Sequence, residues 1–165
     1  RIAPTECDNF YRKQQLIGYV HDETACFFGG VQGNAGLFSN ANDLAKLCQM
    51  WLNKGTYGNE RILSPKTVEL FLTEKSSTSR RGLGFDKPDM ENPEKSPTAI
   101  EASASTIGHL GFTGTCFWID PEQELIYIFL CNRVYPSRTH DALSQLNIRP
   151  ELFSTIYRSI KNHSK

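Results

Sequence analysis

The chain has 165 residues, of which 39% are hydrophobic and 22% charged, and its 18 basic and 18 acidic side chains give a formal net charge of zero. This length suits one domain with a buried core, and the balanced charge offers no basic field, so we predict that neither nucleic acid nor an anionic membrane is a partner. No apolar run approaches the roughly 20 residues of a membrane-spanning helix, and the first residues do not follow the charged-then-apolar pattern of a signal segment.

The first 38 residues predict mainly irregular backbone, with extended pieces at 2–5 and 16–21 and a glycine-dense loop at 29–36. The spacing of the loop glycines matches no phosphate-binding motif, so tight turns explain them better. The adjacent His21, Asp22 and Glu23 would alternate across an extended strand, which favours a structural hydrogen-bond network over a metal site. We predict no metal and no cofactor.

Two helices are predicted next. Ser39 or Asn40 can cap the first, which Gly55 ends, and its apolar side chains recur at i, i+3, i+4 and i+7, namely Leu44, Leu47, Cys48 and Trp51. Ser64-Pro65 is a start signal for a second, shorter helix that contains residues 68–72. The string Tyr57-Gly58-Asn59 between them is interpreted as a hairpin turn.

Residues 81–85 predict a strand, whereas 87–105 predict a loop, because that segment contains three prolines, many charges and no hydrophobic period. A loop of this length is uncommon inside a compact domain unless it is functional. We therefore predict a mobile loop at 87–105 that acts as a lid over the strand that follows.

Residues 112–119 and 125–132, joined by the turn 120–124, predict the strongest hairpin of the chain. The second strand is apolar on both faces, so we expect a central strand with helices above and below it. Pro150 starts a terminal helix that supplies one of these covers through Phe153, Ile156, Tyr157 and Ile160. Arg133 and Arg138 follow the hairpin, and we interpret them as solvated or paired side chains rather than as ligand-binding ones.

Five cysteines, an odd number without C-x-x-C spacing, argue against a zinc site and a redox dithiol. If Ile119 pairs with Leu125, Cys116 lies opposite Ile128 and Cys131 points to the other face of the sheet, so these two thiols could not bridge. We interpret the cysteines as small buried hydrophobic residues.

The segment 108–121, Gly-His-Leu-Gly-Phe-Thr-Gly-Thr-Cys-Phe-Trp-Ile-Asp-Pro, is the most informative part of the sequence. It places His109 at the mouth of a very apolar strand, where an imidazole can donate or accept a proton. Gly111 has no Cβ, so a substrate could lie against the backbone there, with a nearby N–H facing a developing oxyanion.

Together with residues 2–6, 29–39, 81–86 and 132–134, this segment resembles the serine hydrolases of the class C β-lactamase, penicillin-binding protein and esterase superfamily. The resemblance implies an α+β fold, a partial β-lactamase-like α/β/α sandwich whose antiparallel sheet carries a C-terminal helix. It also implies a catalytic role for His109 in the third, H-x-G motif. The Phe112 N–H would form half of an oxyanion hole, and Gly111 and Thr113 would line the substrate.

The superfamily takes its nucleophile from an S-x-x-K motif, and none of the nine lysines of this chain has a serine three residues before it. We therefore expect residues 1–165 to be a single incomplete domain, the C-terminal half of a larger one, and to be inactive alone. Its expected partners are the missing N-terminal half, a small-molecule or cell-wall-type substrate of the intact parent, and a second copy bound through an exposed sheet edge. The resemblance implies a bacterial periplasmic or extracytoplasmic location.

Leu110 departs from the superfamily, which usually has a threonine or serine there to contact the substrate carboxylate. The leucine weakens the case for selectivity toward β-lactams or D-Ala-D-Ala and leaves ester, amide or peptidoglycan-like substrates open. On an alternating strand Thr113 and Thr115 share the face of Gly111, which makes their hydroxyls the candidates to replace the missing one. Two alternatives remain: a non-catalytic binding or docking module that keeps the scaffold, and hydrolysis by a cysteine within reach of His109.

Overall fold

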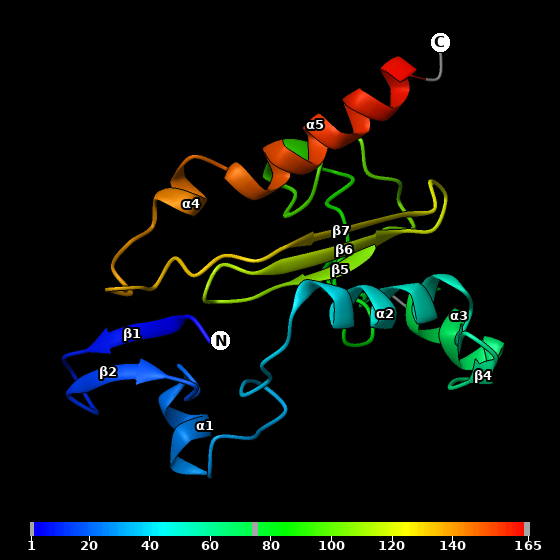
Figure 1. Ribbon diagram of the computed structural model, residues 1–165. Helices are drawn as coiled ribbons and strands as arrows, with labels where there is room; N and C mark the ends of the chain where they lie inside the picture. Colours follow the sequence, from blue (N-terminus) through cyan, green and yellow to red (C-terminus); the bar gives the residue numbers. More distant parts are fainter. Residues whose placement is uncertain (1, 74–75, 164–165) are drawn as a thin grey trace.

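Residues 2–73 and 76–163 are described by a computed structural model, in which one sheet lies between two layers of helices (Figure 1). The antiparallel sheet has the spatial order β5-β6-β7, formed by β5 (Ile107–Leu110), β6 (Cys116–Asp120) and β7 (Leu125–Phe129). Helix α5 (Ile148–His163) covers one face, and α2 (Ala41–Leu52) with α3 (Pro65–Thr73) covers the other. The predicted α+β fold, a partial α/β/α sandwich with a C-terminal helix on an antiparallel sheet, is confirmed.

The order of the strands corrects one expectation. The predicted central strand, β7, is an edge strand of the sheet, and β6 occupies the centre. Both faces of β7 are nevertheless covered as predicted. Tyr127 packs toward α5, while Ile126 and Ile128 pack into the cluster between the sheet and α2. Self-association through the edge of the sheet stays a prediction.

The register of the central hairpin also differs from the predicted one. Ile119 pairs with Ile126 rather than with Leu125, and Cys116 pairs with Phe129. The difference arises because Asp120 belongs to β6 and pairs with Leu125, which shortens the turn to four residues. Cys131 lies beyond the end of β7 at Phe129, so the strand alternation behind the predicted argument against a bridge does not extend to it, and all five thiols are free.

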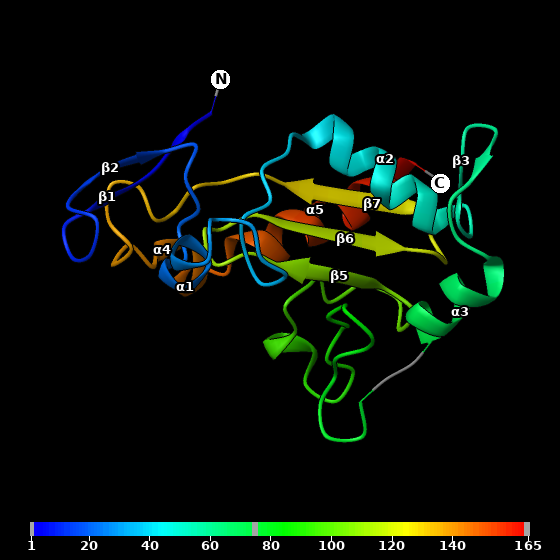
Figure 2. The same ribbon diagram turned by 90° about the horizontal axis from the view of Figure 1, so that it is seen from below.

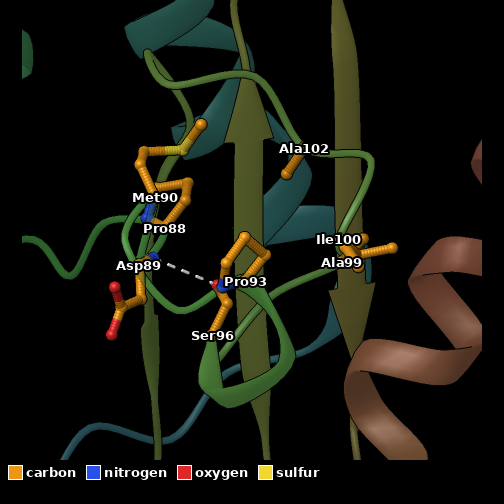
Figure 3. Close-up of a pocket in the computed structure, with 8 residues that line it drawn as sticks. All are labelled: Pro88, Asp89, Met90, Pro93, Ser96, Ala99, Ile100 and Ala102. Carbon is orange, nitrogen blue, oxygen red and sulfur yellow. Dashed lines mark hydrogen bonds between the residues drawn. The ribbon is translucent and has the colours of Figure 1, made fainter.

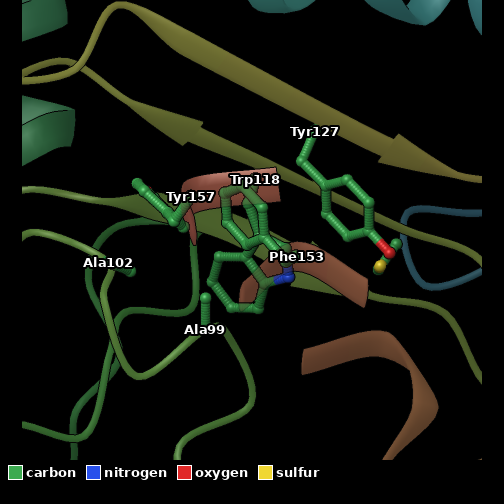
Figure 4. Close-up of a cluster of buried hydrophobic side chains, with 7 residues drawn as sticks. Ala99, Ala102, Trp118, Tyr127, Phe153 and Tyr157 are labelled. Atoms are coloured by element: carbon green, nitrogen blue, oxygen red, sulfur yellow. The ribbon is translucent and has the colours of Figure 1, made fainter. Parts of the chain in front are cut away.

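Two hydrophobic clusters hold the layers together. The larger one lies between the sheet and α5, where the Phe153 and Tyr127 rings stack with centroids 4.5 Å apart and Trp118 is 1% exposed (Figure 4). The second joins the opposite face to α2 and α3 through Cys48, Ile107 and Ile119. Each fully buried aromatic or branched side chain contributes about 1.5–3 kcal/mol, which makes these clusters the main stabilising term.

The predicted helices are present, although α5 begins at Ile148, two residues before the predicted start at Pro150. Asn40 caps α2 by accepting a hydrogen bond from the Asp43 N–H at 3.1 Å, and the Ser64 hydroxyl accepts from the Thr67 N–H at 3.0 Å at the start of α3. The string at 57–59 forms the predicted hairpin, between β3 (Thr56–Tyr57) and β4 (Glu60–Arg61). A short helix, α4 (Ala142–Gln145), precedes α5. None of the helices described in 2–73 and 76–163 has the length and apolar character that a bilayer crossing requires.

The N-terminal region is more regular than predicted. It forms a hairpin of β1 (Pro4–Asp8) and β2 (Gln14–Ile17), followed by α1 (Glu23–Phe27). The Asp8 carboxylate closes the hairpin turn by accepting hydrogen bonds from the Phe10 and Tyr11 N–H groups, each at 2.9 Å. The five-residue α1 is too short to show an apolar period, so only its Asp22 cap could have indicated it.

The segment 76–105, which leads into β5, lies beside the β5 edge of the sheet (Figure 2). The predicted strand at 81–85 is wrong: the chain turns there, with the Gly82 N–H bonded to the Phe85 carbonyl at 2.9 Å, and sheet pairing is limited to a bridge between Asp86 and Gly108. Residues 87–105 are irregular as predicted, apart from one turn of 3-10 helix at Pro93–Lys95. Ala99 and Ala102 bury their side chains beneath α5, and mobility of the loop stays a prediction.

Candidate active-site wall

His109 lies near the end of β5 and is exposed. It pairs across the sheet with Phe117, so its side chain belongs to the face that α2 and α3 cover. Gly108, its neighbour, has no room for a side chain, because a Cβ there would collide with the Phe117 carbonyl and the Trp118 ring. The backbone beside the imidazole is therefore fixed by close packing.

Both nitrogens of the His109 ring have partners. Nε2 lies 3.1 Å from Nη1 of Arg81, and Nδ1 lies 2.8 Å from the Leu110 carbonyl oxygen. Arg81 in turn reaches Asp86, with Nη2 3.7 Å from Oδ2, and Arg80 binds the same carboxylate through Nε at 2.7 Å. Asp86 is 1% exposed, so a buried carboxylate anchors the cation that meets the histidine.

The residues after His109 form a tight turn rather than the start of a strand. The Gly111 N–H donates to the Thr115 carbonyl at 2.7 Å and the Gly114 N–H donates to the Gly111 carbonyl at 3.0 Å. The alternation predicted for 112–119 therefore begins only at Cys116, and the predicted shared face of Thr113 and Thr115 does not exist as a strand face. A Cβ on Gly111 would lie 2.5 Å from Thr115 Oγ1, so a side chain at this position would force the Thr115 hydroxyl to move.

Phe112 occupies the corner of this turn, with 62% of its surface exposed. Among the described residues, its backbone N–H has no hydrogen-bond partner, while its carbonyl accepts from Arg133 Nε at 2.9 Å. The Arg133 guanidinium also lies 4.6 Å from the centre of the Phe112 ring, and the Arg133 N–H binds the Thr113 carbonyl at 2.8 Å. Arg133 thus clamps the turn, in which the Phe112 N–H has no hydrogen-bond partner among the described residues.

The polar residues near the N-terminus form the structural network that was predicted. Arg138 binds the Glu6 carboxylate in a bidentate fork, at 2.7 and 2.8 Å, and its Nη2 also binds Glu23 at 2.7 Å. This hydrogen bonding from Arg138 lowers the pKa of Glu6 against the opposing effect of burial. His21 Nε2 lies 3.1 Å from the same carboxylate, and burial is the main reason that its own pKa is lowered.

The cysteine hypothesis finds no support in the geometry. Cys116 pairs with Leu110 and faces α5, opposite to the face of His109, and burial raises its pKa to about 11. Burial also raises the pKa of Cys48, on α2, to about 11. In the part of the chain that the structure describes, neither His109 nitrogen contacts a thiol or a hydroxyl.

Two hollows border the loop 87–105, and neither is lined by the candidate site residues. The first has a volume of about 20 Å³, enough for a single water, and is lined by Pro88, Asp89, Met90, Pro93, Ser96, Ala99, Ile100 and Ala102 (Figure 3). The second, of about 360 Å³, lies between the loop and α5. Because α5 covers the face opposite to His109, both hollows are separate from the candidate wall.

Sequence reasoning identified His109, Gly111, Phe112 and Thr113 as one segment, and the structure keeps them together. It missed the contact of Arg81 with His109. The sequence signal for that contact was the pair Arg80-Arg81 at the start of the predicted strand 81–85, and a run of basic residues is usually solvated.

An antiparallel sheet between helices, with a histidine and a glycine turn at the end of one strand, is the arrangement expected of a β-lactamase-like serine hydrolase wall. Comparison with known families agrees, since the Beta-lactamase family model matches residues 4–148. The chain belongs to this family of serine hydrolases.

Curated relatives from Salmonella paratyphi B, Salmonella newport and Salmonella heidelberg carry the name "Putative D-alanyl-D-alanine carboxypeptidase". Each is 38% identical to this chain over 144 residues, which is 86% of this chain and 32% of the relative. The chain thus spans about a third of the length of the curated relatives that it matches.

Proposed function

We propose that this chain is the C-terminal portion of a β-lactamase-like serine hydrolase and forms one wall of its active site. The observation that carries the proposal is the segment 108–114, in which an exposed histidine, held by Arg81, precedes a clamped glycine turn inside a family match that covers most of the chain. The acyl-serine mechanism of the family would then need a nucleophile from a part of the protein outside these 165 residues.

Each site residue has a chemical task in this proposal. His109 transfers or holds a proton near the reacting centre, because an imidazole can do both near neutral pH. The Phe112 N–H, which has no hydrogen-bond partner among the described residues, is one of the two donors of an oxyanion hole, and the loss of one such donor typically costs about 10²–10³ in rate. Gly111 and Thr113 line the path of the substrate along the turn.

The substrate class follows from the relatives and from Leu110. The Salmonella relatives are named D-alanyl-D-alanine carboxypeptidases, so a peptidoglycan-like peptide is the first candidate, and an extracytoplasmic location follows from such a substrate. Leu110, however, packs against the cluster beneath α5 and offers no hydroxyl. Ester and other amide substrates, which need no carboxylate contact, are therefore included in the proposal.

A chimera tests the function. The 144-residue matched segment of a Salmonella relative is replaced by this chain, and the product is assayed with p-nitrophenyl esters, a chromogenic cephalosporin and a D-Ala-D-Ala peptide. We expect turnover by the chimera and background rates for the 165-residue chain alone. His109→Ala should lower kcat/KM of the chimera by about 10²–10⁴, whereas His140→Ala, at an exposed loop position, serves as the matched control.

Two results would contradict the proposal: hydrolysis by the isolated chain, or an active chimera that is indifferent to His109→Ala. A folded chimera without turnover on any of the three substrates would favour the second candidate, a non-catalytic docking module. The hydroxyl that is lost at position 110 is the specific observation in favour of that alternative. In that case the missing N-terminal half of the domain, rather than a substrate, would be the main partner of this chain.

A further inference from the structure

The hydrogen bonds of His109 determine which of its nitrogens carries the proton. An arginine guanidinium has only donors, so Nε2, 3.1 Å from Arg81, must accept and carries no hydrogen. A carbonyl oxygen has only lone pairs, so Nδ1, 2.8 Å from the Leu110 oxygen, must donate. Only the neutral Nδ1–H tautomer satisfies both contacts.

Arg81 is itself held by the Asp86 carboxylate. Its guanidinium approaches the buried Asp86 carboxylate, which Arg80 also binds through Nε and Nη2. The Asp86 backbone is bonded to Gly108, the residue before His109, by two hydrogen bonds of 2.7 and 3.0 Å. Arginine and histidine are therefore tied to the same short piece of backbone, although 28 positions separate them.

We propose that Arg81 is a positioning residue that fixes His109 as the Nδ1–H tautomer, with the Nε2 lone pair directed at the guanidinium. This role rests on the proposed function, in which His109 is the proton-handling group of the wall. It follows that Nε2 is the nitrogen that exchanges partners when a substrate or a nucleophile arrives, and that Arg81 must yield its hydrogen bond at that moment.

The orientation of the ring depends on the same contact. His109 is exposed, and its ring takes part in two hydrogen bonds that define its direction. The Leu110 bond alone is local and leaves the other side of the ring free. The Arg81 bond is the contact that ties the far side of the ring to a second element of the chain.

Nitrogen chemical shifts of histidines labelled with ¹⁵N test the proposal in the 165-residue chain. At a pH where the imidazoles are neutral, the shifts of Nδ1 and Nε2 report the tautomer ratio, and the spectrum of His109→Asn identifies the His109 signals. We expect His109 to be mainly the Nδ1–H form. Arg81→Met, which removes the donor but keeps much of the volume, should move the ratio toward the Nε2–H form by roughly twofold to tenfold, the factor typical of one hydrogen bond.

Two matched variants separate the contact from charge and from folding. Arg80→Gln removes the adjacent positive charge without touching His109, and it should change the ratio much less than Arg81→Met. Arg81→Lys keeps a donor and should restore part of the Nδ1–H population. The His21 signals serve as an internal control, because a loss of fold would move them as well.

The proposal is overturned if His109 is mainly Nε2–H in the unaltered chain, or if Arg81→Met leaves the ratio unchanged while the His21 signals stay in place. Neither measurement requires catalysis, so the outcome is independent of the chimera assay. An inactive chimera with the expected tautomer change would refute the proposed function alone, and an active chimera without that change would refute the positioning role alone.

Discussion

Asp120 at the end of β6 is the polar centre of the larger cluster, and its replacement by alanine gives the sharpest stability prediction. The side chain is 0% exposed and accepts a hydrogen bond from the Tyr157 hydroxyl at 2.5 Å, one from the Ser103 hydroxyl, and one from the Ser103 N–H at 3.2 Å. Its Oδ1 also accepts from the N–H groups of Glu122 and Gln123 in the turn to β7. One carboxylate thus joins the loop, the sheet and α5.

The expected cost follows from these contacts. A hydrogen bond to a charged group contributes about 1.5–3 kcal/mol, but bonds that share one acceptor are not additive. Removal of the carboxylate also leaves the Tyr157 hydroxyl buried without its acceptor, which costs about 1–3 kcal/mol. We expect Asp120→Ala to lower the free energy of unfolding by about 3–5 kcal/mol, a large part of the 5–15 kcal/mol typical of a domain.

Urea denaturation followed by tryptophan fluorescence measures this loss, since Trp118 lies in the same cluster and is 1% exposed. Asp89→Ala is the matched control, because the Asp89 carboxylate closes a similar turn by accepting from the Glu91 and Asn92 N–H groups, while among the described residues no buried hydroxyl donates to that carboxylate. It should cost no more than about 1 kcal/mol. Equal losses for the two variants would refute the reasoning.

The same site gives a pH dependence. Burial raises the pKa of Asp120, but the hydrogen bonds from Ser103 and Tyr157 and from the turn backbone outweigh burial, and the net pKa is lowered. A lowered folded pKa means that the stabilisation is fully present above the unfolded pKa of about 3.9 and is lost as the pH falls through the folded value. Stability of the Asp120→Ala variant should therefore fall less between about pH 5 and pH 2 than that of the unaltered chain.

Two further predictions concern the Arg138 fork and the buried thiols. Arg138→Met should lower the free energy of unfolding by about 2–3 kcal/mol, because Glu6, which is 3% exposed, is left without the Arg138 cation. Since this contact lowers the pKa of Glu6, the variant should also lose less stability than the unaltered chain as the pH falls below about 4.3. Urea titrations at pH 7 and pH 3 measure both effects. Cys48 and Cys116, whose pKa values burial raises to about 11, should be about 0.1% thiolate at pH 8 and resist a thiol reagent until urea unfolds the chain.

Lys46→Met, which removes a cation from an exposed pair with Asp43, is the control for Arg138→Met and should cost less than about 1 kcal/mol. A comparable loss from both variants would contradict the role of the buried fork. For the thiols, the reagent should modify the remaining three cysteines in the folded chain and all five in urea. Modification of all five at one rate without urea would contradict the burial of Cys48 and Cys116.

Local patterns predicted the parts of the fold that neighbouring residues decide. The capped starts of α2 and α3, the hairpin at 57–59 and the apolar period of α5 all arise from contacts within a few residues, so the sequence was a sufficient guide. The short α1 and the absence of a strand at 81–85 were missed, because a five-residue helix has no visible period and a short apolar run alone does not distinguish a strand from a turn.

In the candidate site, too, the sequence predicted what neighbouring residues decide and missed the contacts between distant ones. The sequence alone determined that His109, Gly111, Phe112 and Thr113 lie together, since they are consecutive or nearly so, and that the chain resembles one family of hydrolases. Only the tertiary structure decided the β6–β7 register, the contact of Arg81 with His109 and the fork between Arg138 and Glu6. The last two join residues 28 and 132 positions apart, and such pairs are selected by the packing of whole layers rather than by any local pattern.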